Sequence, residues 1–174
     1  MTANYLEQLA AEWYEYCGYF VRRNVLVGPR AAGGFEAELT ILAVHLGQRT
    51  VVHVEPSMDA HSWDKREKRY RARFDAGRRF IPGLLGDFKV AGEIRQIALI
   101  GLGSRTNHPT LGGGEVLTLP DFLAEIIASV GTVTEASGTV GQQYPILRTL
   151  QFVADNRRAL MAALLDQDPR QIGF

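Results

Sequence analysis

Residues 34–63 read GFEAELTILAVHLGQRTVVHVEPSMDAHSW, and this stretch decides the fold. Two runs rich in β-forming residues, 35–46 and 50–55, flank a short break at the Gly-Gln pair 47–48. So short a connection predicts an antiparallel hairpin. Successive side chains in a strand point to opposite faces. The first run therefore presents one polar and one apolar face, and the second run ends on a carboxylate, Glu55.

The chain on either side of this hairpin alternates between helical and extended patterns. Apolar residues at three- and four-residue spacing predict helices, and short β-branched runs predict strands. The order is a helix at 4–16, a strand at 19–27, the hairpin, a helix beginning near Trp63, a strand at 93–102, a loop at 104–114, and helices at 119–130 and 146–165. This order predicts a single α/β domain over 1–174, with a core at about 4–102 and C-terminal helices at about 119–166.

Two prolines are expected to end elements. Pro56 lacks a backbone N–H, so it should end the second strand of the hairpin or place that strand at a sheet edge. Pro82 and the glycine after it should stop the helix that begins near Trp63. Within that helix, Trp63, Tyr70 and Phe74 recur at helical spacing and should face the core.

The composition is that of an ordinary globular protein. The chain has 174 residues, 46% hydrophobic and 22% charged, which excludes a disordered chain. A lone cysteine, Cys17, excludes an intrachain disulfide and favours a reducing compartment, and we expect it to be a small core residue. No run approaches the roughly 18 apolar residues that span a bilayer, and the first residues lack a secretory pattern. We therefore expect a cytoplasmic protein with no membrane partner.

The charges sum to zero but are unevenly spread. There are 19 Lys and Arg against 19 Asp and Glu. Residues 64–79 contain eight basic and three acidic residues, a net +5, which leaves −5 for the rest of the chain. Such a segment attracts polyanions even in a neutral molecule. The alternative is a solvated helix face held by i,i+4 ion pairs.

The order of elements and the acidic strands resemble the PD-(D/E)xK nuclease superfamily, which has the restriction-endonuclease-like fold. In that family a strand with an acidic residue leads through a hairpin to a second strand that reads apolar, acidic, any residue, Lys. A helix and a further strand follow. The resemblance covers residues 4–102 and implies a mixed central sheet of about four to five strands flanked by helices.

The resemblance implies a metal-dependent nuclease that hydrolyses phosphodiester bonds in DNA. Glu38 and Glu55 would ligate Mg²⁺, with Mn²⁺ as a substitute, and Glu36 or Asp59 would be auxiliary ligands. Carboxylate oxygens are the ligands that Mg²⁺ prefers, and the metal would polarise the phosphate and orient the water. For the glutamates, the alternative is a solvent-facing strand or a strand end emerging into water.

The sequence departs from the family pattern at two positions. One alignment places Thr40 where the family has Asp, whereas a shift by two residues places Glu38 there. Ser57 stands where the family has Lys and supplies no cation. Lys65 or Lys68, on the following helix, would then provide the displaced catalytic lysine.

The basic helix would contact the substrate. Arg66, Arg69 and Arg73 lie at helical spacing and would bind DNA phosphates. Because of the two departures, a second hypothesis stays open: a catalytically degenerate module that binds nucleic acid or a protein partner without cleavage. A homodimer also stays open. His53 would either line the site or be a packed strand residue, since no histidine pair has metal-ligand spacing.

Overall fold

The computed structural model describes residues 5–132 and 139–165. The chain divides into two compact units, Met1–Phe122 and Leu123–Phe174, and each is described by itself. The expectation of one domain over 1–174 stays a prediction. Among the described helices, none combines the length and the apolar character needed to cross a membrane.

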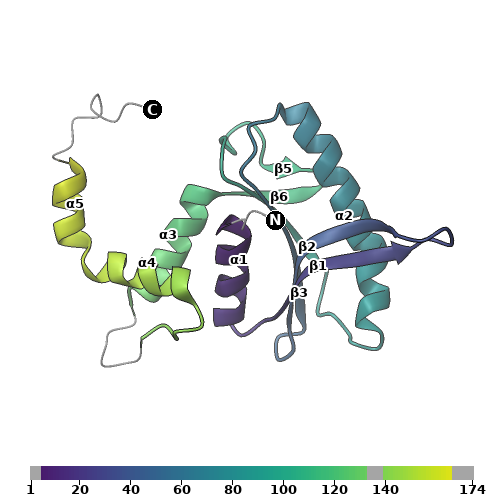
Figure 1. The fold of residues 1–174 in the computed structure, drawn as a ribbon, viewed down its shortest axis with the longest axis horizontal. Coiled ribbons are helices and arrows are strands. Elements are labelled where there is room, and N and C mark those ends of the chain that lie inside the picture. Colours follow the sequence, from purple (N-terminus) through teal and green to yellow (C-terminus); the bar gives the residue numbers. More distant parts are fainter. Residues whose placement is uncertain (1–4, 133–138, 166–174) are drawn as a thin grey trace. The chain divides into compact units, whose positions relative to one another are not determined.

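The first unit contains two long helices and a sheet (Figure 1). Its elements are α1 (Tyr5–Tyr16), β1 (Phe20–Pro29), β2 (Phe35–His45), β3 (Thr50–Ser57), α2 (Trp63–Leu85), β4 (Arg95–Ile100), β5 (Thr110–Leu111) and β6 (Gly114–Thr118). The alternation of apolar residues with period two or about 3.6 forms these elements where the sequence predicted them, from α1 to β4. The α/β class is therefore confirmed.

The sheet has six strands in the order β1-β2-β3-β4-β6-β5. β1, β2 and β3 form an antiparallel meander, β4 and β6 run parallel to β3, and β5 is antiparallel to β6. The prediction of four to five strands was too low, because 104–114 was assigned to a loop. Gly112 and Gly113 there adopt positive φ angles of 60° and 85°, which make the tight turn between β5 and β6.

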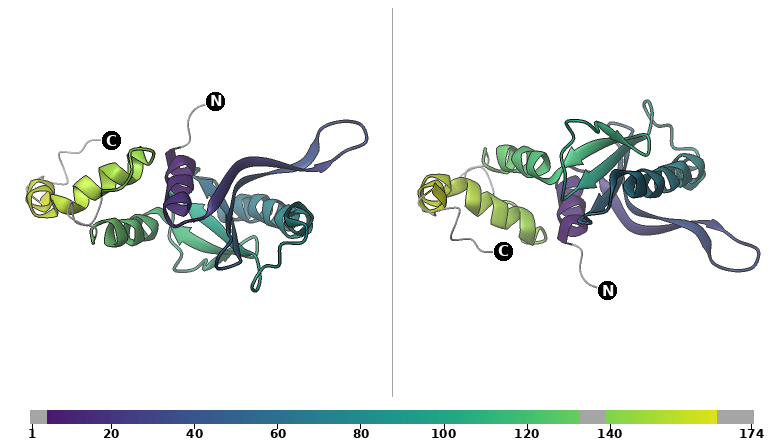
Figure 2. Two further views of the ribbon diagram at one scale, coloured as in Figure 1. Left: turned by 90° about the horizontal axis from the view of Figure 1, so that it is seen from below. Right: turned by 90° about the horizontal axis from the view of Figure 1, so that it is seen from above.

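Helices cover both faces of this sheet. α1 and α2 lie on opposite sides of it (Figures 1 and 2). α2 buries Tyr70, Phe74 and Ile81 against the sheet, and β4 is buried on both faces, as predicted. Because α2 packs across this face of the sheet, its arginines reach the acidic residues of the hairpin.

Two element ends differ from the predictions. β3 continues through Pro56 to Ser57 because pairing with β2 has already ended at Val54, so the missing N–H breaks no bond on that side. α2 continues past Pro82 to Leu85, since the fully buried Ile81 holds this last turn against the core.

Cys17 is exposed, so its prediction as a core residue was wrong.

The second unit is helical where it is described. α3 (Leu119–Val130) begins at the end of the first unit, and α4 (Pro145–Asp155) and α5 (Arg157–Leu165) follow. The single helix predicted at 146–165 is thus two helices. They separate at Asn156, whose φ of −99° and ψ of 15° leave the helical region.

Candidate functional site

Glu55 is the centre of a buried polar cluster at the end of β3. Register places Thr40 of β2 directly opposite it, one step beyond the last paired residues, Ile41 and Val54. Thr40 donates twice, from its backbone N–H to Oε1 at 2.9 Å and from its hydroxyl to Oε2 at 2.6 Å. The glutamate side chain is only 7% exposed. β2 therefore binds this carboxylate where ordinary strand pairing would otherwise continue.

A fully buried histidine completes the bonding of Glu55. Nε2 of His53 lies 2.9 Å from Oε1 of Glu55. On the other side of the ring, the side-chain amide of Gln96 lies 3.2 Å from Nδ1 and also donates to the carbonyl of Phe74 at 2.8 Å. Because the amide nitrogen is a donor, Nδ1 must accept and Nε2 must carry the proton. Gln96 thereby orients the ring of His53 so that Nε2 donates to Glu55.

The carboxylate of Glu55 is stabilised in its charged form. Burial alone would raise its pKa, but the bonds from His53 and Thr40 and the charge of Arg73 outweigh burial and lower the pKa below the ordinary 4.5. Nη1 of Arg73 lies 3.5 Å from Oε2. The carboxylate thus accepts three hydrogen bonds from Thr40 and His53 and pairs with Arg73.

Asp59 is the second acidic residue held by arginines of α2. It pairs with Arg69 and, at 3.2 Å, with Nε of Arg66, and it accepts the hydroxyl of Ser57. Despite some desolvation, the Ser57 and Arg69 bonds hold the pKa of this carboxyl well below its ordinary value. Arg66 is buried and also donates to the carbonyl of Leu102 at 2.8 Å. The guanidinium of Arg66 is therefore used in holding the chain after β3 and β4 to α2.

A small cavity of about 130 Å³ lies between these two clusters. Tyr70 of α2 contributes a buried hydroxyl whose proton has no acceptor among the described residues. Burial raises the pKa of Tyr70 to about 12; the charge of Arg69 and its N–H groups oppose this shift, and the carboxylates of Asp59 and Glu55 add to it, so the hydroxyl keeps its proton. The lining residues are Thr40, Glu55, Pro56, Ser57, Arg69, Tyr70 and Arg73.

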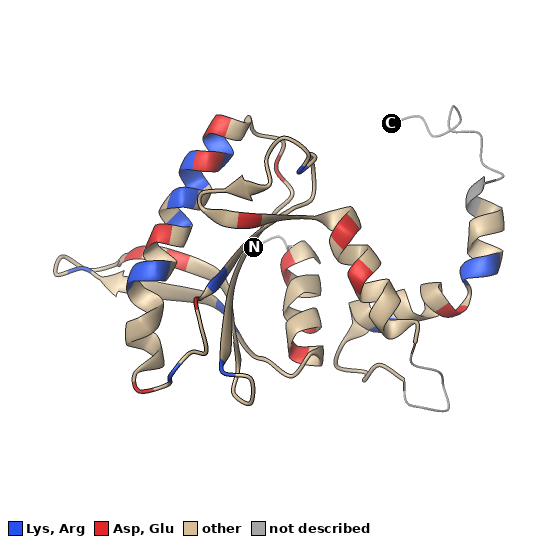
Figure 3. Ribbon diagram, turned by 180° about the vertical axis from the view of Figure 1, so that it is seen from behind, with Lys and Arg blue, Asp and Glu red and all other residues tan. Residues whose placement is uncertain are grey.

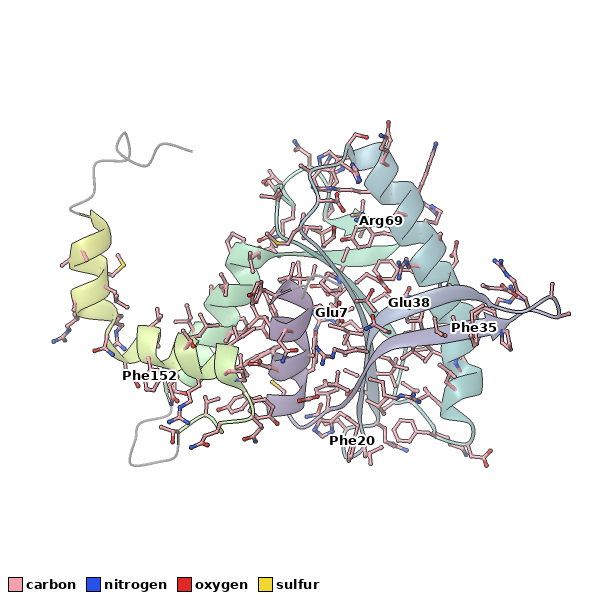
Figure 4. All side chains as sticks on the ribbon, in the orientation of Figure 1. Glu7, Phe20, Phe35, Glu38, Arg69 and Phe152 are labelled. Carbon is pink, nitrogen blue, oxygen red and sulfur yellow. The ribbon has the colours of Figure 1, made fainter. Side chains whose placement is uncertain are left out.

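The remaining residues expected at the site lie farther out. Glu36 pairs with Arg79 of α2 at 2.8 Å. Glu38 is exposed, and its carbonyl accepts a bond from Arg73; Figure 4 labels Glu38 on β2 and Arg69 on α2. Lys65 and Lys68 are exposed on α2, and in the described part of the chain no carboxylate pairs with either. The structure thus brings Glu55 to the cavity with Arg69 and Arg73, and Asp59 pairs with Arg69 beside it.

The donor set does not fit a magnesium site in this arrangement. Glu36, Glu55 and Asp59 each face an arginine, and Mg²⁺ requires carboxylate oxygens that converge on one point. Within residues 5–132 and 139–165, no three His, Cys, Asp or Glu side chains are grouped to hold a metal ion. Mg²⁺ binding stays a prediction that these ion pairs weigh against.

Sequence reasoning missed three functional contacts. Thr40 was weighed only as a departure from a family position, whereas it is the main hydrogen-bond donor to Glu55. Hairpin register is the signal that would have paired them, because a short turn fixes which residues stand opposite. Tyr70 was assigned to the core alone, and Gln96 was not singled out at all; neither residue carries a sequence signal for its role.

Comparison with known proteins gives no relative: no family model, no curated protein and no solved structure matches this chain.

Proposed function

We propose that this chain is a nucleic-acid-binding module that holds the phosphate backbone along α2 and does not cleave it. The observation that supports this proposal is the set of hydrogen bonds and the ion pair that Glu55 makes. The carboxylate that the nuclease resemblance assigns to metal binding already accepts from Thr40 and His53 and pairs with Arg73. A metal would have to displace these donors, so the residue acts as an internal anchor between β2 and β3.

The basic residues of α2 support the proposal that the chain binds nucleic acid. Basic and acidic residues alternate along the helix (Figure 3). Arg71 and Arg78 pair with acidic residues of the same helix, whereas Lys65 and Lys68 are exposed and pair with no carboxylate of the residues that the structure describes. Phosphate contacts from exposed Lys and Arg supply most of the non-specific affinity for nucleic acids.

The order of helices and strands also supports a nucleic-acid-binding module. α1, the β1–β3 meander, α2 and β4 follow in the order that the resemblance to restriction-endonuclease-like proteins implies. A protein of this fold that has lost its metal ligands would keep the surface that faces nucleic acid. Metal-dependent hydrolysis of DNA remains the competing hypothesis, and a protein partner or homodimer remains untested.

Fluorescence anisotropy with labelled duplex DNA, single-stranded DNA and RNA, over a range of salt concentrations, tests binding. If Lys65, Lys68, Arg69 and Arg73 each contact one phosphate of duplex DNA, the logarithm of affinity should fall with the logarithm of salt with a slope of about −4. Lys65→Ala and Lys68→Ala should each reduce the slope by about 1. Lys89→Ala removes an exposed lysine outside α2 and should leave the slope unchanged.

Cleavage is measured in parallel on plasmid DNA with Mg²⁺ or Mn²⁺. We expect no cutting by the wild-type chain. Metal-dependent cutting that Glu55→Gln abolishes would overturn the non-cleaving proposal in favour of the nuclease. Absence of any salt-dependent binding, or equal slopes for all three lysine variants, would overturn the nucleic-acid proposal.

A further inference from the structure

We propose that the cavity lined by Ser57, Arg69, Tyr70 and Arg73 binds a single phosphate group. The group would be inorganic phosphate or the terminal phosphate monoester of a nucleic-acid strand. The cavity volume of about 130 Å³ is well below the roughly 300 Å³ of cavities that enclose drug-sized ligands. A group of a few atoms therefore fits, whereas a whole nucleotide does not.

Tyr70 supplies a buried hydrogen-bond donor that no described residue uses. The residue is only 2% exposed, and the proton of its hydroxyl has no acceptor among the described residues. A buried polar group without a partner is destabilising, so such groups are rare in folded proteins. Tyr70 lines the cavity, and an oxygen of a bound anion would accept this proton.

Arg69 and Arg73 keep N–H donors that are not used in bonds to the described residues. A guanidinium carries five N–H groups in a fixed plane and is suited to bind phosphate oxygens in pairs. The described bonds use two in Arg69, to Asp59 and Ser57, and involve only Nη1 of Arg73. The side chains are 39% and 36% exposed, so the remaining donors are accessible from outside.

The charge around the cavity favours an anion. Among the residues that line it, Arg69 and Arg73 supply two positive charges and Glu55 supplies one negative charge, which leaves 2 − 1 = +1. The carboxylate of Glu55, like that of Asp59 beside Arg69, is already bonded to donors of this chain. An entering anion therefore meets an excess of donors and of positive charge, whereas a cation is repelled by them.

Tyr70→Phe tests the proposal with little effect on the fold. It removes only the unpartnered hydroxyl, so the variant should unfold at the same temperature as the wild type or slightly higher. Calorimetric titration with sodium phosphate should show binding to the wild-type chain, weakened roughly tenfold or more in the variant, because a hydrogen bond to a charged acceptor is lost. Tyr5→Phe removes a hydroxyl from a 78% exposed tyrosine and should bind like the wild type.

Thermal unfolding supplies an independent readout. A ligand that binds only the folded chain raises the melting temperature with concentration. Phosphate also stabilises proteins generally through exclusion from their surface. The gain over an equal ionic strength of chloride should therefore be larger for wild type and Tyr5→Phe than for Tyr70→Phe. Equal gains in melting temperature for the wild type and both variants, or no calorimetric binding at millimolar phosphate, would overturn the proposal. The hydroxyl of Tyr70 would then bind a water molecule.

Oligonucleotides distinguish the two sources of phosphate, and this arm rests on the proposed function. Strands ending in a 5′-phosphate, a 3′-phosphate or hydroxyls only should differ in affinity for the wild type and converge for Tyr70→Phe. Phosphate binding without any nucleic-acid binding would keep the cavity proposal and refute the proposed function. Nucleic-acid binding with no phosphate binding at the cavity would keep the proposed function and refute this inference.

Discussion

Replacement of Glu55 by glutamine should destabilise the chain, and this result separates an internal anchor from a metal ligand. The amide has the shape of the carboxylate but loses the charge and turns one acceptor into a donor. If the NH₂ group stands at Oε1, it meets the donors of Thr40 and His53. If it stands at Oε2, it meets Arg73, and the hydroxyl of Thr40 must accept a bond instead of donating one. The first orientation sets donor against donor, and both orientations remove the charge of the acceptor.

The expected size follows from these contacts. Bonds from Thr40 and His53 to a charged acceptor contribute more than bonds to a neutral one, by about 1 kcal/mol each, and an unsatisfied buried donor adds about 1 kcal/mol. Arg73 is 36% exposed and can turn toward water, so its contribution is small. The sum is about 2–3 kcal/mol of unfolding free energy.

Urea unfolding at neutral pH measures this loss. Trp13 and Trp63 both belong to the first unit, so their fluorescence reports the unit that contains Glu55. With a urea slope of about 2 kcal/mol per molar, the midpoint should fall by about 1 M or more. Glu38→Gln, on an exposed side chain, should change the unfolding free energy by less than about 0.5 kcal/mol.

An unchanged or higher midpoint in Glu55→Gln would refute the anchor. Carboxylates gathered for an absent cation repel each other, so neutralising one of them would then stabilise the chain. A wild-type midpoint raised by Mg²⁺, relative to sodium chloride of equal ionic strength, would contradict the same reasoning, because a cation bound only by the folded state adds stability.

Two further predictions follow from the buried cluster. Gly77→Ala should lose about 1–2 kcal/mol of stability despite the better helix propensity of alanine, because its Cβ would lie 2.4 Å from Nδ1 of the buried His53. Gly83→Ala, in open space on the same helix, should be neutral or stabilising, and equal urea midpoints for the two variants would contradict the close packing. Because the folded pKa of Glu55 is lowered, its stabilisation is present above the ordinary value of 4.5 and is lost as the pH falls through the folded pKa. Unfolding free energy should therefore fall more steeply below pH 4.5 in the wild type than in Glu55→Gln, and parallel curves measured by urea unfolding would contradict this.

The local elements could be predicted because each depends on neighbours in the sequence. Period-two alternation identified the hairpin of β2 and β3, and helical spacing placed Tyr70 and Phe74 of α2 against the core. β5 and β6 were not predicted because a glycine-rich stretch is typical of a loop. Only the packing of Phe74 against Gly114, where a Cβ would lie 2.4 Å from the ring, explains why glycine stands there.

The candidate site was predicted as a set of residues and not as a set of contacts. Glu55, Arg69 and Arg73 line one cavity, and Asp59 pairs with Arg69 beside it. The sequence, however, assigned the carboxylates to a metal and the arginines to phosphates, as two separate surfaces. In the folded chain these carboxylates and guanidinium groups pair with one another. The remaining N–H donors and the net positive charge are left exposed.

The sequence by itself determined the alternating faces of the strands, the apolar stripe of α2 and the separation of charge into +5 at residues 64–79 and −5 elsewhere. The tertiary structure alone decided how those charges pair. Glu36 and Arg79 are 43 residues apart in the chain and 2.8 Å apart in space. Coulombic attraction depends on that spatial distance and on the exclusion of water, and both were set when α2 packed against the face of the sheet.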